Sequence, residues 1–279
     1  MFFNLLLLSG FTFAVIYPLL FWTTRKVTLK NTFYKFNLTL ICVVGSFSVF
    51  ELCLSHFAQR PLLFLWWIAL MCVSAYSWNR EKVNPLWISL PCLFGIPALF
   101  QIEGQMFFSP PLAPAALLAP AALLAPAALL APAVLLLWTM SVLAGLIFSM
   151  SLYSGILGHW YIEMKKLPLT YLNKVTHIFG VLLCVRLLAD VGLLFSENVL
   201  SNGDQIPISQ FILTSEGFFL WVAILFGTVF PFVLIFFVRG TLQEGSHTSA
   251  TGILYVIFIS ILIGDLTYKY YWAKYNLFL

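Results

Sequence analysis

Residues 158–177 read GHWYIEMKKLPLTYLNKVTH, a polar stretch that lies between two long apolar segments. It holds two of the four histidines of the chain, one carboxylate, three lysines and a proline. Each flanking segment has about 20 predominantly apolar residues, the length that crosses the ~30 Å hydrocarbon layer of a bilayer as a helix. The pattern therefore predicts a short connection between two transmembrane helices.

The same apolar character extends over the whole chain of 279 residues, of which 62% are hydrophobic and only 9% are charged. Soluble domains carry about 25% charged residues, so the composition indicates a lipid environment. Because a bilayer offers the backbone no hydrogen-bond partners, and the pattern is not that of a β-barrel, each crossing should be an α-helix. The sequence predicts an all-α polytopic membrane helix bundle, with residues 1–279 as a single integral membrane domain in contact with lipid. The net charge of +4 is assigned to loops and not to nucleic-acid binding.

Eight apolar stretches are long enough to span the membrane, and the tryptophans fall near their ends, as expected at membrane interfaces. The first stretch has no basic leader and no small-residue cleavage site, so we expect a retained span and not a signal peptide. The fourth stretch contains Pro91, Gly95 and Pro97, and the seventh contains Pro231, which predicts irregular helices at both places. The predicted spans are 2–22, 36–56, 62–78, 85–102, 133–157, 174–196, 217–238 and 250–272.

Basic residues predict how the spans are oriented. The loops after the first, third, fifth and seventh spans contain lysine or arginine, for example Arg25, Arg80, Lys174 and Arg239. Under the positive-inside rule these loops are cytoplasmic, so both termini lie outside, in what we expect to be a bacterial inner membrane. The opposite loop at 196–216 fits this orientation, because it carries three carboxylates and neither lysine nor arginine.

Residues 112–135 contain a repeated hexapeptide, Leu-Ala-Pro-Ala-Ala-Leu, whose last copy is degraded. Every sixth residue is a proline, and each proline costs about 3 kcal/mol inside a helix, so a straight helix is excluded. A further crossing here would also place the lysines of the 158–177 connection outside. We therefore expect an apolar segment that does not cross the membrane.

Charged side chains inside membrane spans are costly, which makes them functional candidates. Those in the predicted spans lie at similar depth, about 12 to 16 residues from the inner ends at ~1.5 Å per residue. Arg186 and Asp190 are four residues apart on one helix face, so we expect an ion pair. Lys269 lies one turn beyond this layer. The members of the layer are Glu51, Arg186, Asp190 and Asp265.

Two interpretations of this charged layer remain open. Three carboxylates around one arginine would drive at least one carboxylate toward its protonated form, which is what a proton relay requires. Alternatively, the charged side chains form a buried polar clamp that holds three helices in register.

The 158–177 connection predicts a second polar group at the inner surface. His159 ends the fifth span and His177 begins the sixth, so the two can face each other, with Glu163 one turn from His159. Such a set could exchange protons with a quinone headgroup, and Trp160 and Tyr161 adjoin it. Haem ligation by two imidazoles is a second option, but haem ligands in helical bundles usually lie deeper, which favours the quinone. Without a ligand, the same run would be an aromatic belt at a helix end.

Two runs in the C-terminal part of the chain are GHWY at 158–161, with Pro168 downstream, and SATGILYV at 249–256, followed by GDL at 264–266. These runs resemble a family of uncharacterised bacterial eight-helix membrane proteins. More distantly, the layout resembles the quinol-interacting membrane subunits of polysulfide- and nitrite-reductase type. That resemblance implies a partner subunit with redox cofactors, with this chain supplying the quinone pocket.

These observations predict a quinone-interacting or proton-conducting membrane subunit of a bacterial respiratory complex, at most a non-catalytic or quinone-binding part of an oxidoreductase. The irregular fourth and seventh spans leave open a small-solute transporter or channel, or a structural subunit of a larger assembly. The sequence contains no nucleophile and base set, phosphate-binding loop or zinc-hydrolase motif. Its five cysteines lack metal-ligand spacing, so neither a metal site nor a self-contained hydrolase or kinase is expected.

Overall fold

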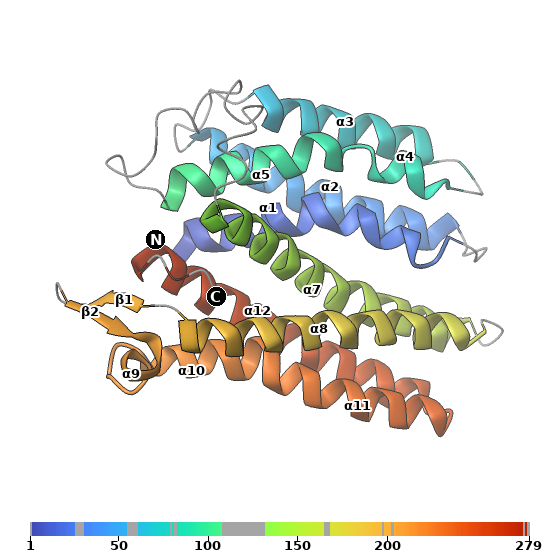
Figure 1. Cartoon of the computed structure of the whole chain (residues 1–279). Helices are drawn as coiled ribbons and strands as arrows, with labels where there is room; N and C mark the ends of the chain where they lie inside the picture. Colours follow the sequence, from blue (N-terminus) through green and yellow to red (C-terminus); the bar gives the residue numbers. More distant parts are fainter. Residues whose placement is uncertain are drawn as a thin grey trace. The chain divides into compact units, whose positions relative to one another are not determined.

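Long helices make up nearly all of the structure, and they divide into two units (Figure 1). Unit 1 comprises Met1–Gly145 and unit 2 comprises Leu146–Leu279, so the boundary falls within one long helix. Whether the two units act as the single predicted domain stays a prediction. The computed structural model describes residues 2–25, 31–54, 61–78, 80, 83–107, 132–164, 168–196, 198–201, 204–275 and 277.

In unit 1 the helices follow the predicted spans. The fourth span is broken as expected, because one helix ends at Ser89 and the next begins at Cys92, on either side of Pro91. Proline removes a backbone donor and disturbs the preceding turn, which explains the break. The elements of unit 1 are α1 (Phe2–Ile16), η1 (Tyr17–Trp22), α2 (Asn31–Leu54), α3 (Pro61–Ser77), α4 (Pro85–Ser89), α5 (Cys92–Phe107) and the first part of α7 (Pro132–Glu163).

Unit 2 contains the last three predicted spans and the end of the fifth. The predicted loop at 196–216 contains secondary structure that the sequence did not predict, because β1 and β2 form an antiparallel hairpin there and α9 follows it. Strands of four residues contain too few alternations for a sequence pattern to reveal them. The elements are the rest of α7, then α8 (Thr170–Ser196), β1 (Asn198–Ser201), β2 (Asp204–Pro207), α9 (Ile208–Phe211), α10 (Phe218–Ile224), η3 (Leu225–Val229), α11 (Phe230–Gln243) and α12 (His247–Tyr275).

The lengths of these helices confirm the all-α polytopic class. Among the described residues, seven helical segments are long and apolar enough to cross a membrane, and α3, with 17 residues, is shorter. A count of eight spans therefore stays a prediction. Most of the repeat at 112–135 lies outside the described residues, and its last residues, from Pro132, begin α7.

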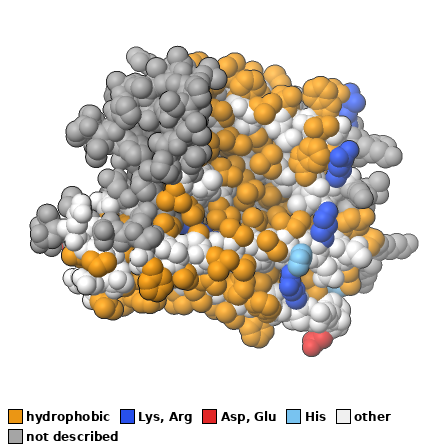
Figure 2. Space-filling view, viewed as in Figure 1, with side chains coloured by type: hydrophobic (Ala, Val, Ile, Leu, Met, Phe, Trp, Pro, Cys, Tyr) orange, Lys and Arg blue, Asp and Glu red, His pale blue; other side chains and the backbone are white. Residues whose placement is uncertain are grey.

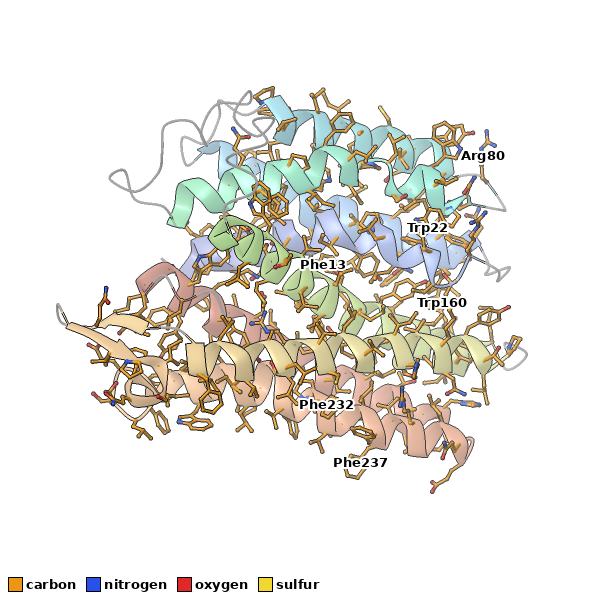
Figure 3. The ribbon with its side chains drawn as sticks, viewed as in Figure 1. Phe13, Trp22, Arg80, Trp160, Phe232 and Phe237 are labelled. Carbon is orange, nitrogen blue, oxygen red and sulfur yellow. The ribbon has the colours of Figure 1, made fainter. Side chains whose placement is uncertain are left out.

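Hydrophobic side chains cover most of the helix surface in view, as a lipid environment requires (Figure 2). Leu188 and Phe195 on α8 are 68% and 84% exposed. Phe232 and Phe237, labelled in Figure 3, lie on α11, where Phe237 is 60% exposed. On the face in view, the visible basic side chains of each unit lie near one end of its helices (Figure 2).

In unit 1 the helix ends that carry basic residues lie together, as alternating spans require. Trp22 Nε1 donates a hydrogen bond to Ser89 Oγ at 3.4 Å, which joins η1 to α4. Lys35 Nζ, near the start of α2, lies 5.4 Å from the ring centroid of Trp78, directly after α3. Trp22 and Arg80, labelled in Figure 3, mark this end of the unit.

The helices of unit 2 also alternate in direction. At one end, the hydroxyl group of Tyr161 on α7 donates to the carbonyl oxygen of Pro168, before α8, at 2.6 Å. The ring of Tyr161 also lies 6.4 Å from that of His247, the first residue of α12. At the other end, the hydroxyl group of Tyr271 on α12 donates to the carbonyl oxygen of Glu216, just before α10, at 2.5 Å.

Candidate functional site

The carboxylate of Asp190, on α8, is the centre of a buried polar network in unit 2. Its Oδ1 lies 3.0 Å from Nε of Arg186, one turn earlier on the same helix. Its Oδ2 accepts hydrogen bonds from the hydroxyl groups of Thr228 on η3, at 2.7 Å, and Tyr268 on α12, at 2.8 Å. All four side chains are buried, so the network ties three helical elements together away from lipid.

Thr228 lies in an irregular turn of its helix. Residues Leu225–Val229 form a π turn just before Pro231, which has no backbone N–H group. The carbonyl oxygen of Phe226 in this turn accepts a hydrogen bond from Ser260 Oγ of α12 at 2.6 Å. A side chain of the neighbouring helix thus pairs with a backbone group within the π turn.

A close approach between η3 and α12 brings Thr228 and Tyr268 together. Gly227 and Gly264 are in backbone contact, and a Cβ atom at Gly264 would collide with the backbone of Gly227. Glycine is the residue that permits helices to approach this closely. The two hydroxyl groups lie 3.1 Å apart, so both reach the same oxygen of Asp190.

The guanidinium group of Arg186 is only partly used by these contacts. Its Cζ lies 4.2 Å from the ring centroid of Tyr268, a cation–π contact, and its Nε faces Asp190. Its Nη1 and Nη2 atoms are buried and, within the described part of the chain, have no hydrogen-bond partner. A permanently charged side chain therefore presents one unfilled edge inside the protein.

A second ion pair lies on α12, next to Tyr268. Lys269 Nζ lies 2.5 Å from Oδ2 of Asp265, and both side chains are buried. Asp265 also lies one turn before Tyr268 on the same helix. The sequence placed Lys269 one turn beyond the charged layer, whereas the structure makes it the partner of Asp265. We call these six residues the Asp190 network: Arg186, Asp190, Thr228, Asp265, Tyr268 and Lys269.

Three of the four residues of the predicted charged layer belong to the Asp190 network. Glu51, the fourth, lies on α2 in unit 1 and is half-buried, so its membership stays a prediction. Sequence reasoning missed Thr228 and Tyr268, because hydroxyl groups are common in membrane helices and only the fold shows that these two converge. The available signal was that Thr228 follows Gly227 and precedes Pro231, a combination that marks an irregular helix.

Sequence reasoning also missed Glu103 in unit 1. This side chain is fully buried, with 0% exposed, and its Oε1 accepts a hydrogen bond from Ser141 Oγ of α7 at 2.5 Å. The predicted span ended at residue 102, whereas α5 continues to Phe107. Because hydropathy locates helix ends only approximately, Glu103 fell one residue outside the predicted span and was not among the candidate residues.

The predicted quinone-binding residues, which we call the histidine group, lie at the end of unit 2 where α7 ends and α8 begins. His159 and Glu163 are exposed on the last turns of α7. Trp160, labelled in Figure 3, is half-buried, and Tyr161 is buried with its hydroxyl group already bonded to the chain before α8. The group consists of His159, Trp160, Tyr161, Glu163 and His177.

His177 makes a different contact from the one expected. Among the described residues, its Nδ1 atom lies 2.6 Å from Nη2 of Arg239 on α11, and no contact joins it to His159. A guanidinium group can only donate, so Nδ1 must accept and the proton of the neutral ring lies on Nε2. That N–H group is the one that could reach a ligand at this surface.

No family model, curated protein or solved structure matches this chain. The chemistry of the site therefore rests on its own residues. The Asp190 network combines two cations, two carboxylates and two hydroxyl groups beside an irregular helix turn. Ionisable groups at such positions in membrane proteins transfer protons or bind charged ligands, or hold helices in register.

Proposed function

We propose that this chain is a proton-conducting membrane subunit of a bacterial electron-transfer complex, and the Asp190 network is the observation that carries the proposal. The carboxylate of Asp190 lies beside the cation of Arg186 and accepts hydrogen bonds from two hydroxyl groups. Hydroxyl groups both donate and accept, so Thr228 and Tyr268 can pass a proton between neighbouring groups. The Asp265–Lys269 pair supplies the next titratable groups along α12.

The test is proton flux in liposomes that contain the purified chain and an internal pH dye. A potassium-driven potential that is negative inside should draw protons in through the wild type and acidify the lumen. The rate of acidification should be at least about tenfold lower for Asp190→Asn. Glu244→Gln is the matched control, because it makes the same change at an exposed carboxylate after α11. Equal flux through Asp190→Asn and wild type would leave the network as a structural clamp and overturn the proposal.

The electron-transfer part of the proposal rests on the histidine group and on the resemblance to quinol-interacting subunits. An exposed imidazole at a helix end can meet a quinone headgroup and exchange a proton with it. We would measure quinone content and quinol-dependent electron transfer in the complex purified from native membranes, with wild type and His159→Gln. Unchanged quinone and unchanged turnover would leave the histidine group as an aromatic belt.

We also propose a bacterial inner membrane with both termini outside. Single cysteines replacing Glu244 and Leu213 test this orientation, since the two exposed residues lie at opposite ends of unit 2. In a background lacking the native cysteines, an impermeant thiol reagent added to whole cells should label only the Leu213→Cys variant. Labelling of only the Glu244→Cys variant would reverse the orientation.

A small-solute transporter is the second candidate, and the π turn η3 is the observation that favours it. Transporters often bind substrates where a transmembrane helix is interrupted beside buried polar groups. Here η3 and Pro231 interrupt the α10–α11 helix beside Arg186 and Asp190. Solute-dependent proton flux in the same liposomes would favour the transporter over the respiratory subunit.

A further inference from the structure

Arg186 carries two amino groups that lack hydrogen-bond partners among the described residues, although its side chain is only 3% exposed. A buried donor without an acceptor is costly, and more so when it is charged. Such a group in a native protein calls for an explanation, and one explanation is a bound water, ion or ligand that supplies the acceptors. The unfilled edge of Arg186 is therefore the feature of the Asp190 network that the proton-conduction proposal does not use.

The contacts of Arg186 determine which ligand fits. Its Nε lies 3.0 Å from Oδ1 of Asp190, and one face of the guanidinium group is covered by the ring of Tyr268. What remains is the edge formed by Nη1 and Nη2, which presents two parallel N–H groups. Two parallel donors match the two oxygens of a carboxylate, whereas a spherical anion can use only a point contact.

We propose that Arg186 binds a small monocarboxylate through Nη1 and Nη2, between α8, η3 and α12. The ligand is held by the guanidinium fork. Asp190 keeps the fork in place, because its Oδ2 is itself fixed by the hydroxyl groups of Thr228 and Tyr268. The inference goes beyond proton conduction, since a site of this kind binds its ligand whether or not protons cross the protein.

The charges of the network indicate that the carboxylate enters together with a proton. Around Arg186, α8 contributes Asp190, α12 contributes Asp265, Tyr268 and Lys269, and the described residues of η3 contribute no charged group. Two cations balance two carboxylates, so the network is formally neutral before binding. An added anion would leave a net negative charge in a low-dielectric site, which favours uptake of one proton shared by the carboxylates of the cluster.

The test uses acetate as the probe and the full-length protein in detergent, without any proton gradient. Tryptophan fluorescence reports the unfolding temperature as acetate is added at constant ionic strength. Acetate is expected to raise this temperature saturably, because a ligand that binds the folded state stabilises it. The neutral analogue acetamide and chloride are expected to have no saturable effect, and an equal effect of either would overturn the carboxylate site.

Proton coupling gives a second readout on the same sample. If one proton accompanies each acetate, the apparent affinity should rise about tenfold for each pH unit between about pH 8 and about pH 6. In weakly buffered solution, acetate should then cause uptake of about one proton per ligand bound. Saturable binding without proton uptake would overturn the coupled form of the proposal.

Arg186→Lys is the informative variant, because it keeps the charge and removes the two-donor fork. Its acetate affinity should fall at least about tenfold. Arg80→Lys is the matched control, since Arg80 is an exposed arginine over the ring of Tyr76 in unit 1, and its affinity should equal the wild type. Wild-type affinity in Arg186→Lys would overturn the proposal. Should that variant fail to fold, the wild-type comparison of acetate with acetamide still decides it, independently of the liposome assay of proton flux.

Discussion

The Asp190 network and the histidine group both bring ionisable and aromatic side chains together in unit 2, but they differ in burial. Arg186 and Asp190 are 3% and 1% exposed and share partners from three helical elements. His177 and Arg239 make a single contact at an exposed position. Solvent can compete with the second contact, whereas burial shields the first, so the same kind of substitution should have very different consequences in the two places.

The difference in burial also determines how each of the two groups could contribute to function. In the Asp190 network each charge depends on the others, so a proton or a ligand there changes the energy of all six residues. In the histidine group His159, Glu163 and His177 are exposed, so function would come from what these side chains meet at the surface. The comparison yields four predictions, from the largest expected effect to the smallest.

Arg186→Leu should cause the largest loss of stability. It leaves the buried carboxylate of Asp190 without its cation, and removing one member of a buried pair costs on the order of 3–5 kcal/mol. Asp190→Asn should be less damaging, because the amide can still accept from Thr228 and Tyr268. Yield of monodisperse protein in detergent, and unfolding temperature, measure both. Equal yields of the two variants would mean that the network does not depend on its charges.

Gly264→Ala should cause the second-largest loss of stability. Its added Cβ atom meets the backbone of Gly227, which cannot move aside as a side chain would. Overpacking of this kind typically costs about 1–3 kcal/mol. Gly252→Ala on the same helix is the control, since a Cβ there meets nothing within 4 Å. A lower unfolding temperature for Gly264→Ala alone is expected. The same temperature for both variants would contradict the close packing of η3 on α12.

Thr228→Val should have a smaller effect. Valine has a similar shape but lacks the hydroxyl group, so Asp190 keeps Arg186 and Tyr268 and loses one donor. Loss of this one donor should cost roughly 0.5–1.5 kcal/mol, because Tyr268 still donates to the same oxygen of Asp190. Unfolding temperature measures the effect, and proton flux should fall with it if the hydroxyl group passes protons. Unchanged stability and flux would remove Thr228 from the network's function.

His177→Gln should have the smallest effect on stability. The contact with Arg239 is exposed, and exposed polar contacts of charged groups contribute about 0–1 kcal/mol. We expect an unfolding temperature close to that of the wild type, measured beside Arg186→Leu in the same detergent. A loss as large as that of Arg186→Leu would show that the two groups do not differ in the way their burial indicates.

The helices and their order could be predicted from the sequence, because a span of apolar residues is a local property. The break at Pro91 and the irregular turn before Pro231 followed from proline chemistry in the same way. The hairpin after α8 could not be predicted, because its strands are too short to show a period. The buried carboxylate of Glu103 was missed for a related reason, since hydropathy gives helix ends only approximately.

The sequence by itself determined that the chain is a polytopic helical membrane protein and that Arg186 and Asp190 share one helix face. Only the tertiary structure decided that Thr228 and Tyr268 complete the site and that Lys269 pairs with Asp265. The reason is physical: lipid and protein interior are both apolar, so a membrane helix has no strong polar stripe to show which face packs inward. Close packing at Gly227 and Gly264 sets that rotation here, and a contact between residues far apart in the chain has no local signature.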